Sequence, residues 1–369
     1  MTNPKVMIMI STRIVGGPGK GVLQLLDRFP SRGIEYLLVT DKRMGTLDTE
    51  FIKLIKEKKL NIEILEYTRT FDPILFKVSR YLVKKYGINI IQSHGYKSHL
   101  IALYIHLVEK TKWITFIHGW SAEDFKMRLY SVFEVVMVRF SDVVIAVSPS
   151  IKKVLSRWHV GGIHTILNAV DKNEIYGLMG GYELRRKLNI SDSAFVIGVI
   201  GRLSPEKGHK YLLEAIARIR HKGIRLLIIG DGPLKDELEK LSNELGLNDT
   251  VTFCGHSQNI RDYYEAINLL VLPSLKEGLP NVVLEAMVMN IPVISTDVGG
   301  VREIITDDYN GWIIEAGNVN SIAHKLNEII EDRKRLAIVA TRLHDSIFPK
   351  FCPDRRADEV VKVYKSLLV

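Results

Sequence analysis

The chain has 369 residues, of which 46% are hydrophobic and 25% are charged. This composition is typical of a soluble globular protein, and the length favours two domains. No apolar run reaches the roughly 18 residues that a membrane span needs, and no signal peptide is expected at the N-terminus. The two cysteines, Cys254 and Cys352, cannot form a disulfide framework. These features predict a cytoplasmic protein.

The net charge of +9 is unevenly distributed along the chain. Residues 1–170 hold 25 Lys and Arg against 14 Asp and Glu, whereas residues 171–369 hold 26 against 28. The basic first half predicts either an anionic partner or a solvated basic surface. Nucleic acid is not expected, because no recognition motif accompanies the charge. Residues 51–60 and 74–86 mix apolar residues with lysine, so they either rest on an anionic membrane or pack on a sheet with lysines outward.

Apolar runs alternate with helical patterns throughout the chain, which predicts βαβ units in buried parallel sheets. The pattern restarts near residue 194, so we expect two Rossmann-like domains, one over 1–168 and one over 169–349. Residues 168–193 are the linker candidate, and a helix within 350–369 is expected to cross back to the first domain. The predicted strands are residues 6–10, 35–40, 88–93, 113–118, 142–148, 195–201, 225–232, 251–255, 269–274 and 291–297.

The first glycine-rich stretch, "VGGPGKG" at residues 15–21, lies between a predicted strand and a predicted helix. A P-loop would require glycine at position 14 and serine or threonine at position 21, and these positions hold Ile14 and Gly21. The ATPase interpretation therefore fails. Bare N–H groups at a helix N-terminus still suit an anion.

Two cations follow the first strand of the second half, in "GRLSPEKGHKYLLEAI". Arg202 and Lys207 at a strand-to-helix crossing suit a diphosphate, although two solvated loop charges would give the same pattern. Further along, Gly230 and Gly232 fail the dinucleotide pattern because position 235 is lysine. We interpret them as tight-turn glycines.

The most informative segment is "LPSLKEGLPNVVLEAM" at residues 272–287. Glu277 lies in a loop after a strand, and Glu285 lies on a helix that opens at Pro280 and Asn281. A loop followed by a helix lets both carboxylates face one ligand, where each can accept hydrogen bonds from vicinal hydroxyls. The amides at the start of the helix suit a phosphate.

This segment resembles the E-x7-E signature of glycosyltransferase family 4, whose members are retaining enzymes of the GT-B fold. "IGRLSPEKG", "PVISTDVGGVREII", "LNAVD" and the opening glycine loop are similar to other stretches of that family. The resemblance covers nearly the whole chain and is more specific in the second half. One departure from the family pattern is Arg302, at a position where the family often has proline. This difference leaves the identity of the acceptor undecided.

The resemblance also implies roles for individual residues. Arg202 and Lys207 would bind the donor diphosphate, Glu285 the ribose hydroxyls, and Gly255 would border the nucleobase. In the first domain, Gly17 would approach the phosphate or the acceptor, and His118 would lie near the sugar. The donor sugar would be held by Glu277 with the backbone that follows it, namely Gly278, Leu279, Pro280 and Asn281.

The predicted reaction is transfer of a sugar from a UDP- or GDP-linked donor, with retained configuration, to a glycan, lipid-linked or envelope polysaccharide acceptor. No metal or other cofactor is expected, because the chain has no D-x-D, and the spacing of His94, His99 and His106 fits no common metal site. We interpret these histidines as helix or loop residues. The alternatives are a sugar-nucleotide epimerase or hydrolase on the same scaffold and a non-catalytic binding protein. The expected location is the cytoplasm, either free or at the inner face of the membrane.

Overall fold

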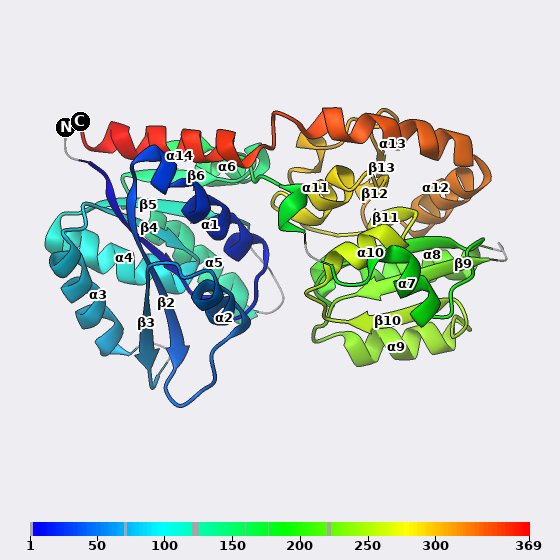
Figure 1. Cartoon of the computed structure of the whole chain (residues 1–369), viewed down its shortest axis with the longest axis horizontal. Coiled ribbons are helices and arrows are strands. Elements are labelled where there is room, and N and C mark those ends of the chain that lie inside the picture. The colour runs from blue at the N-terminus through cyan, green and yellow to red at the C-terminus, as the bar shows by residue number, and fades with distance from the viewer. Residues whose placement is uncertain (1–2, 70–71, 120–124, 159, 176, 220–222) are drawn as a thin grey trace. The chain divides into compact units, whose positions relative to one another are not determined.

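The computed structural model describes residues 3–69, 72–119, 125–158, 160–175, 177–219 and 223–369, with side chains of 125–129 left aside. The chain divides into two compact units (Figure 1). Unit 1 comprises residues 1–168 together with Pro353–Val369, and unit 2 comprises Ala169–Cys352. Each unit contains its own parallel sheet, so the two Rossmann-like folds expected from the sequence are confirmed.

Unit 1 forms, within its described residues, a seven-stranded parallel sheet in the order β3-β2-β1-β4-β5-β6-β7. Two edge strands, β3 and β7, were not predicted, because β3 is mostly half-exposed and β7 has only three residues. The strands are β1 (Lys5–Ile10), β2 (Glu35–Arg43), β3 (Ile62–Tyr67), β4 (Ile90–His94), β5 (Lys112–Ile117), β6 (Val143–Ala146) and β7 (Ile163–Thr165).

Helices cover both faces of this sheet. Alternate residues of β1 enter two different cores: Val6, Ile8 and Ile10 pack with α1, α2 and α14, whereas Met7 and Met9 pack with α3, α4 and α5 (Figure 1). Burial on both faces explains the near-continuous apolar strands. The helices are α1 (Gly17–Arg28), α2 (Glu50–Glu57), α3 (Pro73–Tyr86), α4 (Tyr96–Glu109), α5 (Phe125–Val138), α6 (Pro149–Arg157) and α14 (Pro353–Leu367).

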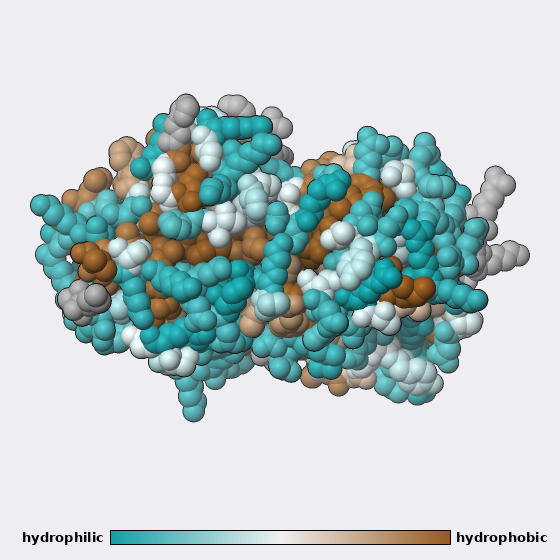
Figure 2. Space-filling view, turned by 90° about the horizontal axis from the view of Figure 1, so that it is seen from above, coloured by the Kyte–Doolittle hydropathy of each residue, from teal (hydrophilic) through white to brown (hydrophobic). Residues whose placement is uncertain are grey.

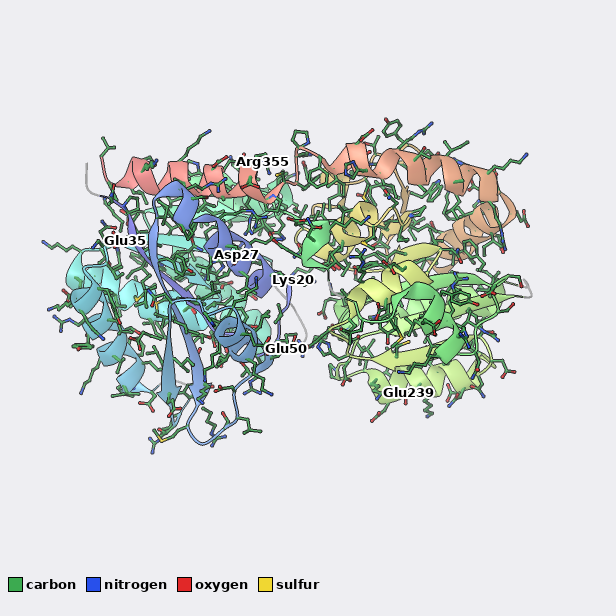
Figure 3. All side chains as sticks on the ribbon, viewed as in Figure 1. Lys20, Asp27, Glu35, Glu50, Glu239 and Arg355 are labelled. Carbon is green, nitrogen blue, oxygen red and sulfur yellow. The ribbon has the colours of Figure 1, made fainter. Side chains whose placement is uncertain are left out.

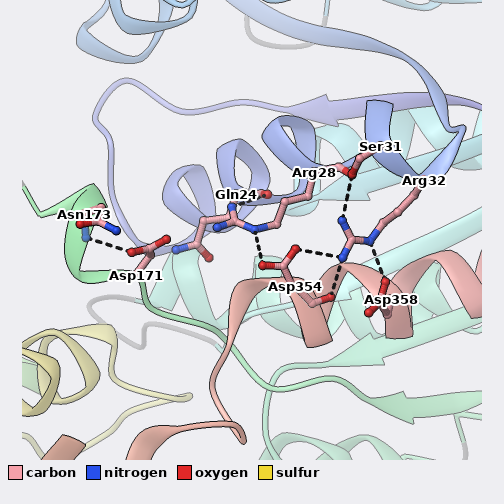
Figure 4. A network of polar contacts seen from close by, with 8 residues as sticks. All are labelled: Gln24, Arg28, Ser31, Arg32, Asp171, Asn173, Asp354 and Asp358. Atoms are coloured by element: carbon pink, nitrogen blue, oxygen red, sulfur yellow. Dashed lines mark hydrogen bonds and ion pairs between the residues drawn. The ribbon is translucent and has the colours of Figure 1, made fainter.

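The C-terminal helix α14 belongs to unit 1 and packs against α1. Its buried residues Val360 and Tyr364 join the core beside Phe29. At its N-terminal end, Arg32 pairs with Asp354 at 3.0 Å and with Asp358 at 2.7 Å (Figure 4). These helices also carry charged side chains, among them Lys20 and Asp27 on α1 and the half-buried Arg355 on α14, which pairs with Glu359 at 2.6 Å (Figure 3). Apolar burial with polar contacts at the edge therefore fixes α14 to unit 1.

Unit 2 forms, over the residues described, a six-stranded parallel sheet in the order β10-β9-β8-β11-β12-β13. The order reverses between β8 and β11, so these neighbours mark the topological switch point of the sheet. The strands are β8 (Phe195–Ile200), β9 (Ile224–Ile229), β10 (Val251–Gly255), β11 (Leu269–Leu272), β12 (Val293–Thr296) and β13 (Trp312–Ile314). The helices are α7 (Gly180–Lys187), α8 (His209–Arg218), α9 (Lys235–Glu244), α10 (Ile260–Ala266), α11 (Asn281–Val288), α12 (Val319–Glu331) and α13 (Arg333–Ile347).

The expectation that residues 168–193 form a linker is wrong, because this stretch contains helix α7, which packs on α10. The buried carboxylate of Asp262 on α10 accepts hydrogen bonds from the backbone N–H groups of Leu178, Met179 and Gly180. An acidic side chain at a helix N-terminus satisfies donors that the helix leaves free. The polar sequence therefore hides a helix that α10 caps from outside.

The two basic amphipathic segments of the first half use their apolar residues inside unit 1. Phe51, Ile52 and Ile55 of α2 are buried, as are Leu75 and Leu82 of α3. The lysines of these helices lie outward, so packing on the sheet accounts for both patterns. None of the helices in the described parts of the chain has the length and apolar character needed to cross a bilayer. The face drawn in Figure 2 is largely hydrophilic, with separate hydrophobic areas.

Candidate functional site

Two glycines after β9 allow its loop to lie directly against the loop after β8. A Cβ on Gly230, whose φ is +147°, would stand 1.8 Å from the carbonyl oxygen of Gly201. A Cβ on Gly232 would stand 2.4 Å from the carbonyl oxygen of Leu203, whose own N–H donates to the Asp231 carbonyl at 3.0 Å. These are tight-turn glycines that bring two strand ends together.

The loop after β8 is also attached to the loop after β11, across the switch point. Gly208 has a φ of +67°, and a Cβ there would stand 2.1 Å from the carbonyl oxygen of Pro273. The Leu275 N–H donates to the Glu206 carbonyl at 2.7 Å. The backbone on both sides of Lys207 is therefore fixed against β11, where ligands of open α/β sheets bind.

Lys207 and Glu277 meet at this point. The Lys207 Nζ lies 2.7 Å from Glu277 Oε1, and the Ser274 hydroxyl donates to the same oxygen at 2.7 Å. The Glu277 side chain is 8% exposed and that of Lys207 is 25% exposed. Both side-chain contacts of Glu277 in the described structure go to Oε1. The second oxygen, Oε2, is therefore available for a ligand hydroxyl, as is the outer side of the ammonium group.

The loop after β12 holds the Glu277 loop from its other side. A Cβ on Gly299, whose φ is +59°, would stand 2.1 Å from the Glu277 carbonyl oxygen, and the Gly300 N–H donates to the Gly278 carbonyl at 2.7 Å. The Thr296 hydroxyl donates to the Ser274 carbonyl at 2.5 Å. Loops after three adjacent strands therefore position one carboxylate. Such support gives the preorganisation that a binding or catalytic site needs.

Arg302, which departs from the family pattern, has a local partner. Its guanidinium donates to Asp297 Oδ2 at 2.7 Å and to Asp297 Oδ1 at 2.9 Å. The pKa of Arg302 is raised by this hydrogen-bonded carboxylate. Both side chains are exposed, so the pair supports the loop after β12 with only a small contribution to stability.

Glu285 lies on α11 and is buried, with 5% of its surface exposed. The hydroxyl of Tyr264, from α10, donates to Glu285 Oε2 at 2.9 Å. Burial, and then the nearby Glu285, raises the pKa of Tyr264 well above its usual range, so the phenol remains a donor. Tyr264 therefore orients the carboxylate. Sequence reasoning missed it, because nothing in "IRDYYEAI" distinguishes it from a core residue.

The other predicted residues of the second half lie at the same carboxyl edge of the sheet. Arg202 is exposed in the loop after β8. Gly255 ends β10 with a φ of +68°, and its carbonyl accepts a hydrogen bond from the Gly230 N–H at 2.9 Å. Helix α11 begins at Asn281, and Pro280 at its N-cap supplies no side-chain cap. The segment from Gly278 to Asn281, with the buried Leu279, thus leads into the N-terminus of α11 directly after Glu277.

In unit 1, the glycine-rich stretch opens α1, with Gly16 as N-cap and Gly17 as the first helical residue. Two of its glycines serve packing. A Cβ on Gly19 would stand 3.3 Å from the ring of Phe51, and a Cβ on Gly21 would stand 2.8 Å from Arg356 Nη1. Arg356 of α14 is 1% exposed and donates to the Gly21 carbonyl at 2.9 Å. The close approach of α14 to α1 thus explains part of the motif.

His118 follows β5 and is half-buried. Its Nε2 lies 2.9 Å from His94 Nδ1 at the end of β4. Burial, and then the charge of Arg356 and the nearby His99, lowers the pKa of His118 to about 3, and burial lowers that of His94 well below its usual range. Both rings are therefore neutral at physiological pH. His94 is a strand residue, so its interpretation as a helix or loop residue was wrong.

A buried cluster of Ser93, His99 and Glu134 has the order of a catalytic triad. Ser93 Oγ lies 2.8 Å from His99 Nδ1, and Glu134 Oε1 lies 3.2 Å from His99 Nε2. However, Ser93 and His99 are fully buried, and the indole N–H of Trp113 donates to the serine oxygen at 2.8 Å. No substrate reaches this hydroxyl, so the cluster is a buried polar network of the core, in which His99 Nε2 has a close contact with Glu134 but no hydrogen bond within the described residues.

Two Rossmann-like parallel sheets, one with charged side chains collected at its switch point, define the GT-B class of glycosyltransferase folds. Comparison with known proteins also identifies the chain as a glycosyltransferase. Residues 182–342 match the model of the glycosyl transferases group 1, and residues 15–174 match that of glycosyltransferase family 4. The chain therefore belongs to glycosyltransferase family 4.

Individual relatives extend over most of the chain. N-acetyl-alpha-D-glucosaminyl L-malate synthase of Bacillus anthracis is 25% identical, over 96% of this chain and 93% of the relative. An Escherichia coli galactosyltransferase that acts on alpha-D-GlcNAc-diphosphoundecaprenol is 24% identical over 78% of each chain. The solved structure of Anabaena HepE with UDP-glucose superposes with a TM-score of 0.86 at 22% identity, covering 98% of this chain and 99% of that one.

Proposed function

We propose that the protein is a retaining glycosyltransferase that takes its sugar from a UDP-linked donor and requires no metal. The observation that carries the proposal is the Lys207–Glu277 pair, 2.7 Å apart and fixed by three loops at the switch point of unit 2. A cation beside a half-satisfied carboxylate matches a diphosphate joined to a polyhydroxylated sugar. UDP as the nucleotide is supported by the HepE complex with UDP-glucose and by the UDP-galactose donor of the Escherichia coli relative.

In the proposed mechanism, the acceptor attacks the same face of the sugar from which the diphosphate leaves. The bond between the anomeric carbon and the phosphate oxygen breaks, the acceptor oxygen forms the new bond, and the departing phosphate takes the acceptor proton. Arg202 and Lys207 stabilise the negative charge that grows on the leaving group. Glu277 holds a sugar hydroxyl, Glu285 holds the ribose, and no protein nucleophile is involved.

The acceptor is proposed to be a glycan or a lipid-linked sugar. One relative supports this proposal, since it acts on a diphosphoundecaprenol-linked sugar, whereas the relative named for L-malate makes that small acid the rival acceptor to be tested. A lipid-linked acceptor is favoured by a surface of unit 1 that exposes Val132, Val136 and Phe140 at helical spacing along α5 and its C-terminal end. Exposed Trp158 lies beside it, with its carbonyl oxygen 3.1 Å from Arg139 Nε. Apolar side chains with an arginine and a tryptophan suit an anionic bilayer surface.

This membrane association is tested by cosedimentation with vesicles of anionic and of neutral phospholipid at low salt. We expect the protein to bind the anionic vesicles, and we expect Val136→Glu with Phe140→Glu to lose that binding. Leu47→Glu is the matched control, because Leu47 is an exposed apolar residue of the same unit that belongs to the segment between β2 and α2 rather than to α5. Failure of the wild-type protein to bind anionic vesicles would contradict the association.

The reaction is tested by incubating the enzyme, without metal, with UDP-glucose or UDP-N-acetylglucosamine and either L-malate or polyprenyl-diphosphate-linked sugars. We expect acceptor-dependent release of UDP and a product with the anomeric configuration of the donor. Release of free sugar without an acceptor would favour a hydrolase, and inversion of configuration would refute the mechanism. Lys207→Ala should abolish transfer, whereas Lys240→Ala, on the exposed side of α9, should not.

A further inference from the structure

A chain of hydrogen bonds runs through unit 1 from α14 to His118. Tyr364 on α14 donates its hydroxyl proton to Gln92 Oε1. Gln92 Nε2 lies 2.8 Å from His94 Nε2, and His94 Nδ1 lies 2.9 Å from His118 Nε2. Tyr364 and Gln92 are fully buried and His94 is 3% exposed. The first three members therefore exchange these hydrogen bonds with one another rather than with water.

The strands place these side chains in line. Gln92 and His94 are two residues apart on β4, so they share one face of the sheet, and Phe116 and His118 repeat this spacing at the end of β5. The ring of His94 stacks on Phe116 with 4.7 Å between centroids. This stacking restrains the His94 ring, so its two nitrogens stay directed at Gln92 and His118.

The direction of the chain follows from its buried end. Burial raises the pKa of Tyr364 well above its usual range, so its phenol keeps the proton that it donates to Gln92 Oε1. The amide of Gln92 then presents its NH₂ group to His94 Nε2, which must accept. A neutral imidazole that accepts at one nitrogen carries its proton on the other. His94 therefore donates from Nδ1 to His118 Nε2.

From this order of donors and acceptors, we infer that Tyr364, Gln92 and His94 are positioning residues that hold His118 as the tautomer protonated on Nδ1. In that tautomer His118 offers an N–H donor and no basic nitrogen to a ligand. Its Nδ1 has no hydrogen-bond partner within the described part of the chain, and the residue is half-buried rather than enclosed. The group it would recognise is an oxygen acceptor, such as a sugar hydroxyl or a phosphate oxygen.

This inference rests on the proposed function for the identity of the ligand, and it adds a chemical restriction to it. A His118 protonated on Nδ1, with Nε2 occupied by His94, cannot remove a proton from the acceptor. The groups that act electrostatically on His118, Arg356 and His99, oppose a positive charge on the ring. His118 therefore binds substrate as a neutral donor, and the acceptor proton must go elsewhere, as in transfer to the departing phosphate.

The first experiment records the ¹⁵N and ¹H signals of the histidine rings in the uniformly ¹⁵N-labelled wild-type protein, without any ligand. The signals of His118 are assigned by their loss in His118→Gln. We expect a neutral ring protonated on Nδ1 from pH 8 to pH 5. A ring protonated on Nε2, or an imidazolium, would overturn the inference, whether or not the protein transfers sugar.

The second experiment compares Tyr364→Phe with a matched control. Tyr364→Phe removes the hydroxyl that orients Gln92, so we expect His118 to become a mixture of tautomers with the fold intact. The control is Tyr86→Phe, which removes a hydroxyl that donates to Glu63 Oε1 at 3.0 Å in the same unit but outside the chain. An unchanged His118 spectrum in folded Tyr364→Phe would overturn the assignment of direction to Tyr364.

A kinetic pair tests the role of His118 as donor. An asparagine amide nitrogen reproduces Nδ1 of histidine more closely than Nε2, whereas a glutamine amide reaches toward Nε2. If Nδ1–H donates to a substrate oxygen, His118→Asn should keep about tenfold more kcat/KM than His118→Gln, the effect of one hydrogen bond. The reverse order would overturn the inference. Equal, wild-type rates in both variants would instead contradict the expectation from the family resemblance that His118 lies near the sugar.

Discussion

Breaking the Lys207–Glu277 contact should destabilise unit 2 measurably, even without a ligand. A hydrogen bond to a charged group contributes about 1.5–3 kcal/mol, and removing one partner of a fully buried pair costs about 3–5 kcal/mol. Lys207 is 25% exposed, which favours the lower end of this range. We therefore expect Lys207→Met to lower the free energy of unfolding by about 1.5–2 kcal/mol. For a unit of this size that corresponds to about 3–8 °C in Tm.

The assay is calorimetric unfolding of the wild-type protein, Lys207→Met, Glu277→Gln and the double variant, all without nucleotide. Because Ser274 still contacts the substituted side chain, Glu277→Gln should cost less than Lys207→Met. The coupling energy of the cycle should reach about 1 kcal/mol. The exposed pair Lys240–Glu244 on α9, 3.7 Å apart, is the control and should couple by less than about 0.5 kcal/mol. Additive effects at Lys207 and Glu277 would refute the view that the two loops support each other.

Three further perturbations test other parts of the structure. Gly230→Ala should lower the free energy of unfolding by more than about 4 kcal/mol, because its Cβ would overlap the Gly201 carbonyl. The control is Gly246→Ala, in open space at a φ of +70°, which should cost about 1–2 kcal/mol. An equal loss of Tm in the two variants would contradict the close approach of the Gly230 and Gly201 loops. Burial, and then the charge of Lys207, lowers the pKa of His209 to about 4. Between about pH 6.5 and 4, His209 therefore binds a proton only in the unfolded chain. The free energy of unfolding should therefore decrease as the pH is lowered through that window, by about 1.4 kcal/mol per pH unit for this group. Urea titrations of His209→Leu should show a weaker dependence of stability on pH, and an unchanged dependence would exclude a contribution from His209. Gly21→Ala should lower the free energy of unfolding by about 1–3 kcal/mol, because the new Cβ displaces the buried Arg356 guanidinium. Amide hydrogen exchange over α14 should become faster, and unaltered exchange there would refute the packing of α14 on α1 through Gly21.

Apolar patterning predicts the central strands of both sheets well, because strands buried on two faces read as continuous hydrophobic runs. It misses β3, β7 and β13, which lie at sheet edges. Short or half-exposed strands there carry little hydrophobic signal. The stretch containing α7 reads as a linker because its polar N-terminus is stabilised by Asp262, more than 80 residues away in sequence. A cap from another element leaves no local signature.

The site shows the same division between local and distant information. Glu277, Glu285 and Lys207 can be found from the sequence because each lies in a motif next to a strand end. Their partners cannot, since Ser274 and Tyr264 are identified only by the approach of loops and helices. The contacts of His118 with His94, and of His94 with Gln92, likewise depend on the pairing of β4 with β5. Sequence motifs indicate the groups that bind a ligand, whereas the residues that orient those groups are set by tertiary packing.

The measurement that tests the central claim most directly is calorimetric titration of the metal-free protein with UDP, GDP and ADP, repeated on Lys207→Ala and Glu285→Ala. We predict that UDP binds the wild-type protein and that both substitutions weaken binding. At 100 times its dissociation constant, UDP should stabilise the wild-type fold by about 2.7 kcal/mol. Absence of binding by all three nucleotides, or UDP binding that is unaffected in both variants, would contradict a donor site at the switch point of unit 2.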